Sequence, residues 1–339
     1  MENQPIIPTT VVGSHPKPSW WHNCKDLYAE GKWGETDLNE LLTDAVDIAI
    51  LDQTRAGLDI ITDGESRRLD GYVDSYYAII ENIVPLPIGR VGGPWGYDQQ
   101  QRYRATGEIA APSGLGIVSE FTYLKENTNF ETKVTCAGPL TFGSRIGPGD
   151  VYDGPVAVAE QFAEVINEEL KGLVNAGARF IQIDEPARGN LGGKEMARLF
   201  NLATDGVDAK LAYHICFGNR YGLARFKRHY SDYFPQILDA NADQFVVEFA
   251  AREMYEVEKF SDWRDGREIG AGVVDVKSFY PESTEDVADR LREVLRHIPA
   301  DKLYVNPDCG FGWSPRYMAI PKLNALVNAT AIIRSEITG

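Results

Sequence analysis

Short apolar runs alternate with amphipathic stretches along almost the whole chain of 339 residues. The apolar runs are rich in β-branched residues and end in small or polar clusters, which is typical of buried strands. This pattern predicts strands at 10–14, 59–63, 133–137, 179–184, 210–216, 244–249, 268–276 and 302–306. Apolar residues at helical spacing predict helices at 40–56, 156–176, 194–202, 284–296 and 321–336. Apolar strands separated by helices indicate a parallel sheet covered on both faces.

Eight such strands predict an α/β fold of the (β/α)8 type, the TIM barrel, formed by residues 1–339 as a single domain. The main alternative is an open doubly wound sheet, which would place a Gly-rich turn after its first strand. The chain has GSHPKP at 13–18 instead, which does not match that turn. The segment 82–129, between strands 2 and 3, is rich in Gly, Pro and aromatic residues. We interpret it as a long excursion, with a hairpin over the mouth of the barrel.

The charge balance limits the classes of partner. The chain has 50 acidic and 34 basic residues, a formal net charge of -16, and its Lys and Arg residues are not clustered. We therefore expect it to bind neither nucleic acid nor acidic membranes. There is no apolar run of the roughly 18 residues needed to span a membrane, and no export signal at the N-terminus. These features predict a cytoplasmic protein.

Four residues of types that commonly bind metal ions stand at the ends of predicted strands. His214 and Cys216 are two positions apart on one strand and so point the same way. Glu248 and Cys309 follow later strands, and a parallel barrel would bring all four to its carboxyl-terminal mouth. An imidazole, two thiolates and a carboxylate suit tetrahedral zinc. The alternative is core packing, which is common for a lone His-x-Cys.

The two remaining cysteines, Cys24 and Cys136, have no comparable neighbours. A chain of this size needs no disulfide scaffold, and a cytoplasmic location keeps thiols reduced. Cys136 lies within the third predicted strand, where a buried cysteine is a small apolar filler.

A second group of polar residues suggests an amino-acid pocket. Glu65 and Asp184 also stand at the ends of predicted strands, and a carboxylate pair in a barrel mouth can bind an ammonium group or act as general acid and base. Ser14 and its backbone amides can bind a carboxylate. The alternative is that Glu65 and Asp184 cap the helices that follow them.

The motifs of the chain resemble those of a known family. They are VVGSHP (11–16), DGE (63–65), GPLTF (138–142), IQIDEPA (181–187), HIC (214–216), VVE (246–248), GVVDVKS (272–278) and NPDCG (306–310). Their order is similar to that in the catalytic domain of cobalamin-independent methionine synthase. The resemblance covers almost the whole chain, which looks like a short, core-only form without the N-terminal barrel of the full-length enzymes.

This resemblance implies a zinc-dependent methyltransferase that converts L-homocysteine to L-methionine. It implies zinc ligands at His214, Cys216, Glu248 and Cys309, and homocysteine-binding residues at Val12, Gly13, Ser14, Glu65 and Asp184. Zinc would make the homocysteine thiolate available at neutral pH.

The chain departs from the family at positions that face the methyl donor. Arg145 replaces a Trp that packs against folate, Asn190 replaces a Glu, and Lys277 replaces a His that acts as proton donor. We therefore predict a methylcorrinoid donor, either methylcobalamin or a corrinoid protein, with Lys277 as a catalytic residue. Trp95 and the rest of the aromatic segment 95–103, in the excursion, are further candidates for donor contacts.

Three alternatives remain. Lys277 keeps a positive charge at the proton-donor position, which favours 5-methyltetrahydrofolate as the donor. A zinc alkyltransferase could act on another thiol, such as coenzyme M, although Glu65 and Asp184 would then have no ammonium group to bind. A protein that binds zinc only for structure would have four saturated ligands.

Overall fold

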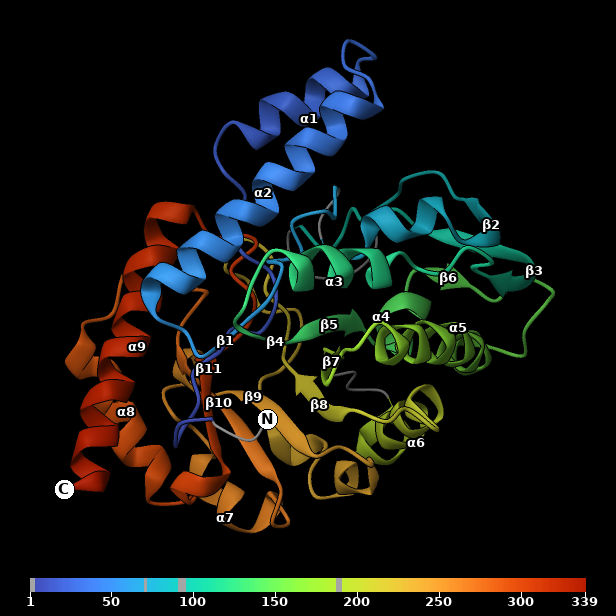
Figure 1. Cartoon of the computed structure of the whole chain (residues 1–339). Coiled ribbons are helices and arrows are strands. Elements are labelled where there is room, and N and C mark those ends of the chain that lie inside the picture. The colour runs from blue at the N-terminus through green and yellow to red at the C-terminus, as the bar shows by residue number, and fades with distance from the viewer. Residues whose placement is uncertain (1–3, 70–71, 91–95, 187–190) are drawn as a thin grey trace.

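Six parallel strands form the main sheet of the computed structural model, which describes residues 4–69, 72–90, 96–186 and 191–339 (Figure 1). Their order is β11 (Leu303–Pro307), β10 (Glu268–Val274), β9 (Gln244–Glu248), β8 (Lys210–Ile215), β7 (Phe180–Asp184) and β5 (Val134–Ala137). Every residue of β5, β7 and β9 is buried. Burial on both faces is what the near-continuous apolar runs of these strands predict.

Backbone hydrogen bonds at the two edges of this sheet complete a ring of eight strands. Thr9 forms a parallel bridge with Val305 of β11. On its other side, the Ile60 amide of β1 (Ile60–Ile61) donates to the Thr9 carbonyl at 3.0 Å. β1 then pairs in parallel with β4 (Glu131–Thr132), and the Lys133 amide donates to the Ile61 carbonyl at 2.9 Å, directly before β5. The predicted (β/α)8 fold is therefore confirmed.

The first predicted strand, 10–14, is wrong in detail. Its regular pairing is limited to the bridge at Thr9. Beyond it the chain leaves the ladder, because its carbonyl groups bind other partners: the Thr62 hydroxyl donates to the Gly13 carbonyl at 2.8 Å, and the Phe311 amide donates to the Ser14 carbonyl at 2.8 Å. These contacts turn residues 12–14 toward the barrel mouth.

The α-helices lie outside the ring of strands, most of them against it. They are α1 (Trp21–Ala29), α2 (Glu35–Ala56), α3 (Ile117–Glu126), α4 (Pro139–Gly143), α5 (Pro155–Asn175), α6 (Gly192–Thr204), α7 (Phe260–Trp263), α8 (Thr284–Leu295) and α9 (Arg316–Thr338). α5 packs against α6, and α8 packs against α9. α8 shows how the sequence sets a boundary, since Ser283 accepts from the Asp286 amide at 3.1 Å and Asp286 accepts from the Ser283 amide at 2.9 Å.

Within the segment 82–129, where we expect a hairpin over the barrel mouth, two strands pair. β2 (Glu81–Pro85) and β3 (Tyr103–Ala110) are antiparallel, and β3 also pairs with the short β6 (Ile146–Gly147). This small sheet lies on the flank of the barrel, close to α5 (Figure 1). α3 follows the hairpin and packs against α5. The excursion therefore adds both a sheet and a helix to the barrel.

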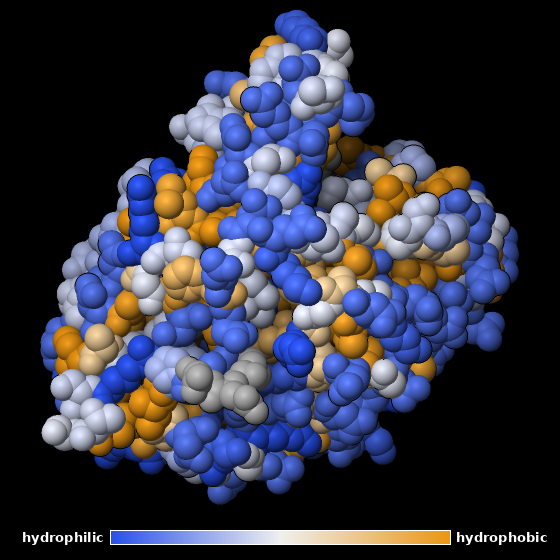
Figure 2. Space-filling model, viewed as in Figure 1, coloured by the Kyte–Doolittle hydropathy of each residue, from blue (hydrophilic) through white to orange (hydrophobic). Residues whose placement is uncertain are grey.

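A helical hairpin formed by α1 and the first turns of α2 projects from the barrel (Figure 1). It has a small core of its own, formed by Trp21, Leu38 and Leu41, and the face seen in Figure 2 is mostly hydrophilic. No helix in the described ranges combines the length and the apolar character that crossing a membrane requires.

Candidate active site

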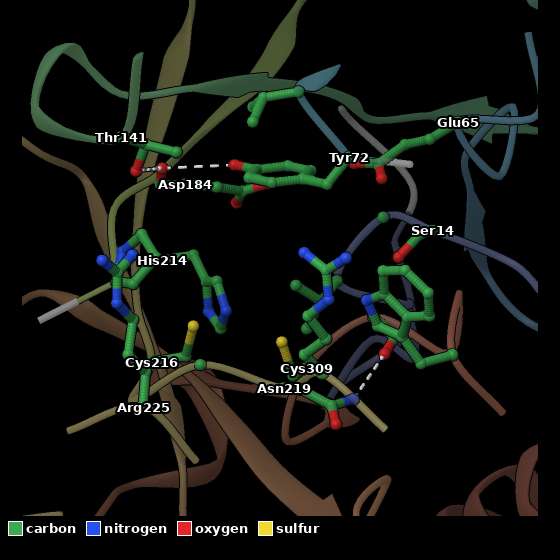
Figure 3. A pocket seen from close by; sticks show the side chains of 18 of the residues that line it. Ser14, Glu65, Tyr72, Thr141, Asp184, His214, Cys216, Asn219, Arg225 and Cys309 are labelled. Atoms are coloured by element: carbon green, nitrogen blue, oxygen red, sulfur yellow. Dashed lines mark hydrogen bonds between the residues drawn. The ribbon is translucent and has the colours of Figure 1, made fainter. Parts of the chain in front are cut away.

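A cavity opens at the carboxyl ends of the barrel strands, where catalytic sites of this fold lie (Figure 3). Predicted residues that line it are Val12, Gly13, Ser14, Glu65, Arg145, Asp184, His214, Cys216 and Cys309. Tyr97 and Gln100 reach it from the chain between β2 and β3. Residues predicted for metal, substrate and donor thus surround one space.

Three of the predicted metal ligands form a compact group, which we call the ligand cluster: His214, Cys216 and Cys309. Their ligand atoms all lie within 4.8 Å of one another, and this is the only such group of three or more found in the described parts of the chain. His214 and Cys216 are at the end of β8, and Cys309 follows β11. Figure 3 shows both sulfur atoms directed into the pocket.

The ring of His214 is oriented for metal binding. Its Nδ1 lies 3.1 Å from the Val246 carbonyl, which fixes the ring plane. Its Nε2 is buried and, within the described structure, has no hydrogen-bond partner. A histidine ligand typically binds a backbone carbonyl through one nitrogen and leaves the other for the metal. A buried imidazole nitrogen beside two sulfur atoms therefore fits a borderline-soft ion such as zinc.

The two thiols differ in acidity. A hydrogen bond from Cys216 stabilises the thiolate of Cys309, so the pKa of Cys309 lies well below its usual value despite burial. The same hydrogen bond, together with burial, raises the pKa of Cys216. Burial alone would lower the pKa of His214, but the Cys309 thiolate outweighs it and raises that pKa. The surroundings of Cys309 therefore favour its thiolate form, the form that binds metals.

The fourth predicted ligand, Glu248, is held beside the ligand cluster by other groups. The Phe217 amide donates to its Oε1 at 2.8 Å, and the ammonium group of Lys277 binds its Oε2. Burial alone would lower the pKa of Lys277, but Glu248 raises it well above its usual value. Asp308 supports the end of β9 by accepting hydrogen bonds from the three backbone amides of residues 249–251.

The two carboxylates of the predicted amino-acid pocket, Glu65 and Asp184, line the cavity together. Figure 3 shows them along one side, with the ligand cluster opposite. Burial raises the pKa of both groups, that of Asp184 to about 7, although His214 lowers the latter. Asp184 ends β7, whereas α6 begins at Gly192 with Leu191 at its N-cap, so Asp184 does not cap that helix.

Residues 12–14 line a third side of the cavity. An added side chain at Gly13 would lie 2.7 Å from Glu65 Oε1, and one at Gly310 would lie 2.0 Å from Ser14 Oγ. Only glycine permits these approaches, which bring the backbone near Ser14 close to the carboxylate of Glu65.

The sequence profile described as "Cobalamin-independent synthase, Catalytic domain" matches residues 7–332. The chain belongs to this family. A methionine synthase from Saccharolobus solfataricus is 33% identical over 341 residues, which cover 99% of this chain and 98% of that protein. A B12-independent methionine synthase from Shewanella sp. W3-18-1, solved in complex with selenomethionine, has a TM-score of 0.83 and 27% identity, with 98% of this chain and 99% of that chain covered. A putative vitamin-B12-independent methionine synthase from Listeria monocytogenes shares the fold, with a TM-score of 0.67, 22% identity and coverage of 95% and 96%.

Membership in the cobalamin-independent synthase family confirms the predicted resemblance and the predicted enzyme class, a methyltransferase of the methionine synthase type. It also overturns one prediction. We expected methylcobalamin or a corrinoid protein as the methyl donor, but the family is defined by its independence of cobalamin. The substitutions at donor-facing positions are therefore not evidence for a corrinoid.

Arginines and aromatic rings also line the cavity, near the predicted donor contact Arg145. Arg145 forms an ion pair with Asp74. The guanidinium of Arg220 lies 5.1 Å from the ring centre of Trp313, and that of Arg225 lies 5.6 Å from the ring centre of Tyr97. Two further predicted donor contacts, Trp95 and Asn190, lie outside the described residues.

Sequence patterns missed several residues around the cavity. They are Tyr72, Asp74, Thr141, Asn219, Arg220, Arg225 and Trp313. Tyr72 and Thr141 donate to the backbone carbonyl of Asp184, each at 3.3 Å. Most of these residues lie in loops beyond the strand ends, where no periodic pattern marks them. A sequence signal does mark Thr141, because it belongs to the GPLTF motif.

Proposed function

We propose that this member of the cobalamin-independent synthase family transfers a methyl group to the thiol of L-homocysteine and forms L-methionine. The observation that carries the proposal is that Glu65 and Asp184 line the same cavity as the ligand cluster. An amino acid whose ammonium group binds these carboxylates would extend its sulfur toward Cys216 and Cys309. The selenomethionine complex of the Shewanella relative supports an amino acid of this shape.

We propose zinc as the metal, held by His214, Cys216 and Cys309, with Glu248 as the fourth ligand. The support is the chemistry of the donors: two sulfur atoms and a buried imidazole nitrogen that is free within the described structure. Zinc, when bound, supplies a positive charge that keeps the substrate sulfur in its nucleophilic thiolate form.

The remaining residues of the pocket bind and orient the amino acid. Glu65 and Asp184 bind its ammonium group through charge-assisted hydrogen bonds. The segment Val12–Ser14 presents backbone and hydroxyl groups for its carboxylate. Tyr72 and Thr141 hold the backbone at Asp184, so that this carboxylate keeps its position.

We propose 5-methyltetrahydrofolate as the methyl donor. The homocysteine thiol gives up its proton to water, the new S–CH3 bond forms as the N5–CH3 bond of the donor breaks, and the leaving nitrogen takes up a proton from water, so that no net proton is consumed. Trp313 and Tyr97 offer ring faces for the planar pterin, and Arg220 and Arg225 offer positive charge for the glutamate carboxylates of folate.

Lys277, predicted as a catalytic residue, takes a different role in this proposal. Its ammonium group binds Glu248, and its raised pKa makes it a weak acid. We propose that Lys277 holds the carboxylate of Glu248 beside the ligand cluster.

A thiol other than homocysteine is disfavoured by charge. Coenzyme M carries a sulfonate and lacks an ammonium group, so Glu65 and Asp184 would repel it.

The test is a methyl-transfer assay with zinc-loaded protein, homocysteine and 5-methyltetrahydrofolate, in which methionine is measured by mass spectrometry. Methionine formation supports the proposal. Homocysteine binding by calorimetry without methionine formation would show that the donor is wrong. Absence of homocysteine binding would show that the acceptor is wrong, and coenzyme M should then be tested in its place.

A further inference from the structure

Arg68 lies directly behind the substrate carboxylate Glu65 and joins it to Glu120 of α3, in the excursion. Arg68 NH1 is 3.0 Å from Glu65 Oε1. On its other side, its Nε and NH2 donate to Glu120 Oε2 at 3.3 and 3.2 Å, and NH2 also donates to the Thr135 carbonyl at 2.9 Å. The ring of Tyr76 lies below the guanidinium at 5.4 Å.

All three charged residues are almost inaccessible to water. The exposed fractions of Glu65, Arg68 and Glu120 are 3%, 2% and 8%. The other charged groups facing them are Asp63 and Lys17, and the Lys17 ammonium donates to the Glu65 backbone carbonyl at 2.7 Å. At this depth each charge acts strongly on its neighbours, because water screens it little.

The contacts divide the carboxylate of Glu65 into a held oxygen and an open one. Oε1 accepts from the Thr135 hydroxyl at 2.8 Å and faces Arg68. Oε2 is buried and has no hydrogen-bond partner within the described part of the chain, in a residue that lines the cavity. A buried carboxylate oxygen without a partner is costly unless a ligand group binds it. The open oxygen is therefore suited to an incoming ammonium group.

Arg68 alone would work against this purpose. A lone guanidinium beside Glu65 would neutralise the carboxylate and repel a substrate ammonium group in the same small space. Glu120 balances the charge of Arg68 from the far side, so the pair can hold Oε1 in place while the negative charge of Glu65 remains available. Glu169 of α5 holds the start of α3 in place. It accepts hydrogen bonds from the amides of Leu115, just before α3, and Val118 at 2.7 and 3.0 Å.

We propose that Arg68 and Glu120 are positioning residues for amino-acid recognition: Arg68 fixes Glu65, and Glu120, supplied by the excursion, balances Arg68 so that Glu65 can bind the substrate ammonium group. This inference rests on the proposed homocysteine methyltransferase function. It gives the excursion a specific role in substrate binding. The competing view is that Arg68 and Glu120 form an ordinary buried ion pair that only attaches α3 to the barrel.

The experiment compares homocysteine binding and steady-state kinetics of wild-type protein with Arg68→Met, Arg68→Lys and Glu120→Gln. We expect Arg68→Met and Glu120→Gln to raise the Kd and KM for homocysteine by about tenfold or more, with the KM for the methyl donor unchanged. Arg68→Lys should recover part of the loss, because it restores the charge. Matched controls are Arg67→Met, which alters the neighbouring half-buried arginine, and Glu126→Gln, on the exposed part of α3; both should bind homocysteine as wild type does.

Two results would overturn the inference. One is a change of less than about twofold in homocysteine Kd for both Arg68→Met and Glu120→Gln, and the other is an equal rise in the KM of acceptor and donor, as general loosening of the fold would cause. Thermal unfolding shows whether Arg68→Met still folds. If it does not, the homocysteine Kd of the milder Glu120→Gln variant decides. If the wild-type protein fails to bind homocysteine, the proposed function is overturned as well. If the wild-type protein binds homocysteine and the variants bind it equally well, only the present inference is overturned.

Discussion

Lys277 and Glu248 form an ion pair in which the side chains are 7% and 0% exposed. The pair lies at the end of β9, next to the ligand cluster, so a side chain predicted to bind metal already has a cation bound to it. Breaking a buried pair by removing one partner leaves an uncompensated charge.

We expect Lys277→Met to lower the free energy of unfolding of the metal-free protein by about 3 kcal/mol, because Glu248 loses its counter-charge. Zinc should restore part of this loss by taking the place of the ammonium group. Urea denaturation with and without zinc measures both values. Lys227→Met, at an exposed position, is the control. An equal loss in both conditions would argue against Glu248 as a ligand.

Cys309→Ser should lose zinc and activity together. Its neighbours lower the pKa of the Cys309 thiol, whereas that of Cys216 is raised, and a serine hydroxyl is a much poorer zinc ligand at neutral pH. Metal content by atomic absorption and the methionine assay measure the two effects. Cys24→Ser changes a cysteine in α1 and should retain both properties. Full zinc content in Cys309→Ser would remove this residue from the metal site.

Asp184→Asn should keep zinc but raise the KM for homocysteine by about tenfold or more, because a charge-assisted hydrogen bond to the ammonium group is weakened. Steady-state kinetics with homocysteine varied, together with the zinc content, provide the measurement. Asp205→Asn, at an exposed position, is the matched control. Unchanged homocysteine binding in Asp184→Asn would contradict the assigned role.

Asp52→Asn should destabilise the protein at neutral pH but not in acid. Asp52 accepts from Arg316 through two bonds of 2.6 Å and lies 3.0 Å from Nε2 of His15. Burial alone would raise the pKa of Asp52, but these bonds outweigh it and lower that pKa well below its ordinary value of 3.8. A carboxylate with a depressed pKa contributes stability above its unfolded pKa and loses it as the pH falls through the folded value.

We therefore expect Asp52→Asn to cost about 3 kcal/mol of unfolding free energy at pH 7. The difference from wild type should shrink progressively as the pH falls below 3.8. Urea denaturation at several pH values tests this, with Asp44→Asn on the exposed face of α2 as the control. A difference that does not change with pH would show that packing, and not charge, accounts for the loss.

Arg220→Met should raise the KM for the methyl donor several-fold and leave the homocysteine Kd unchanged. The guanidinium of Arg220 lies over Trp313 in the lining of the cavity, and its Nε is buried without a hydrogen-bond partner in the structure as described. Kinetics with each substrate varied in turn separate the two effects. Arg102→Met, at an exposed position, should change neither value. A rise in homocysteine Kd would place Arg220 on the acceptor side.

Residues at the strand ends were accessible to prediction because two local rules mark them. Buried strands are recognisable as apolar runs, and the (β/α)8 fold places whatever follows such a run at the catalytic mouth. His214, Cys216, Asp184 and Glu65 were found in this way. The first strand was the exception, since the bonds to Thr62 and Phe311 that replace its ladder come from distant parts of the chain.

The sequence by itself determined the alternation of strands and helices, the barrel that follows from it, and the chemical types of the side chains at the mouth. Only the tertiary structure decided which of those side chains meet, since Cys309 joins His214 and Cys216 across about 90 residues of chain. It also decided that Lys277 binds Glu248 and that Glu120 reaches Glu65 through Arg68. Such pairings depend on distances between elements far apart in the chain, which no periodicity of apolar residues encodes.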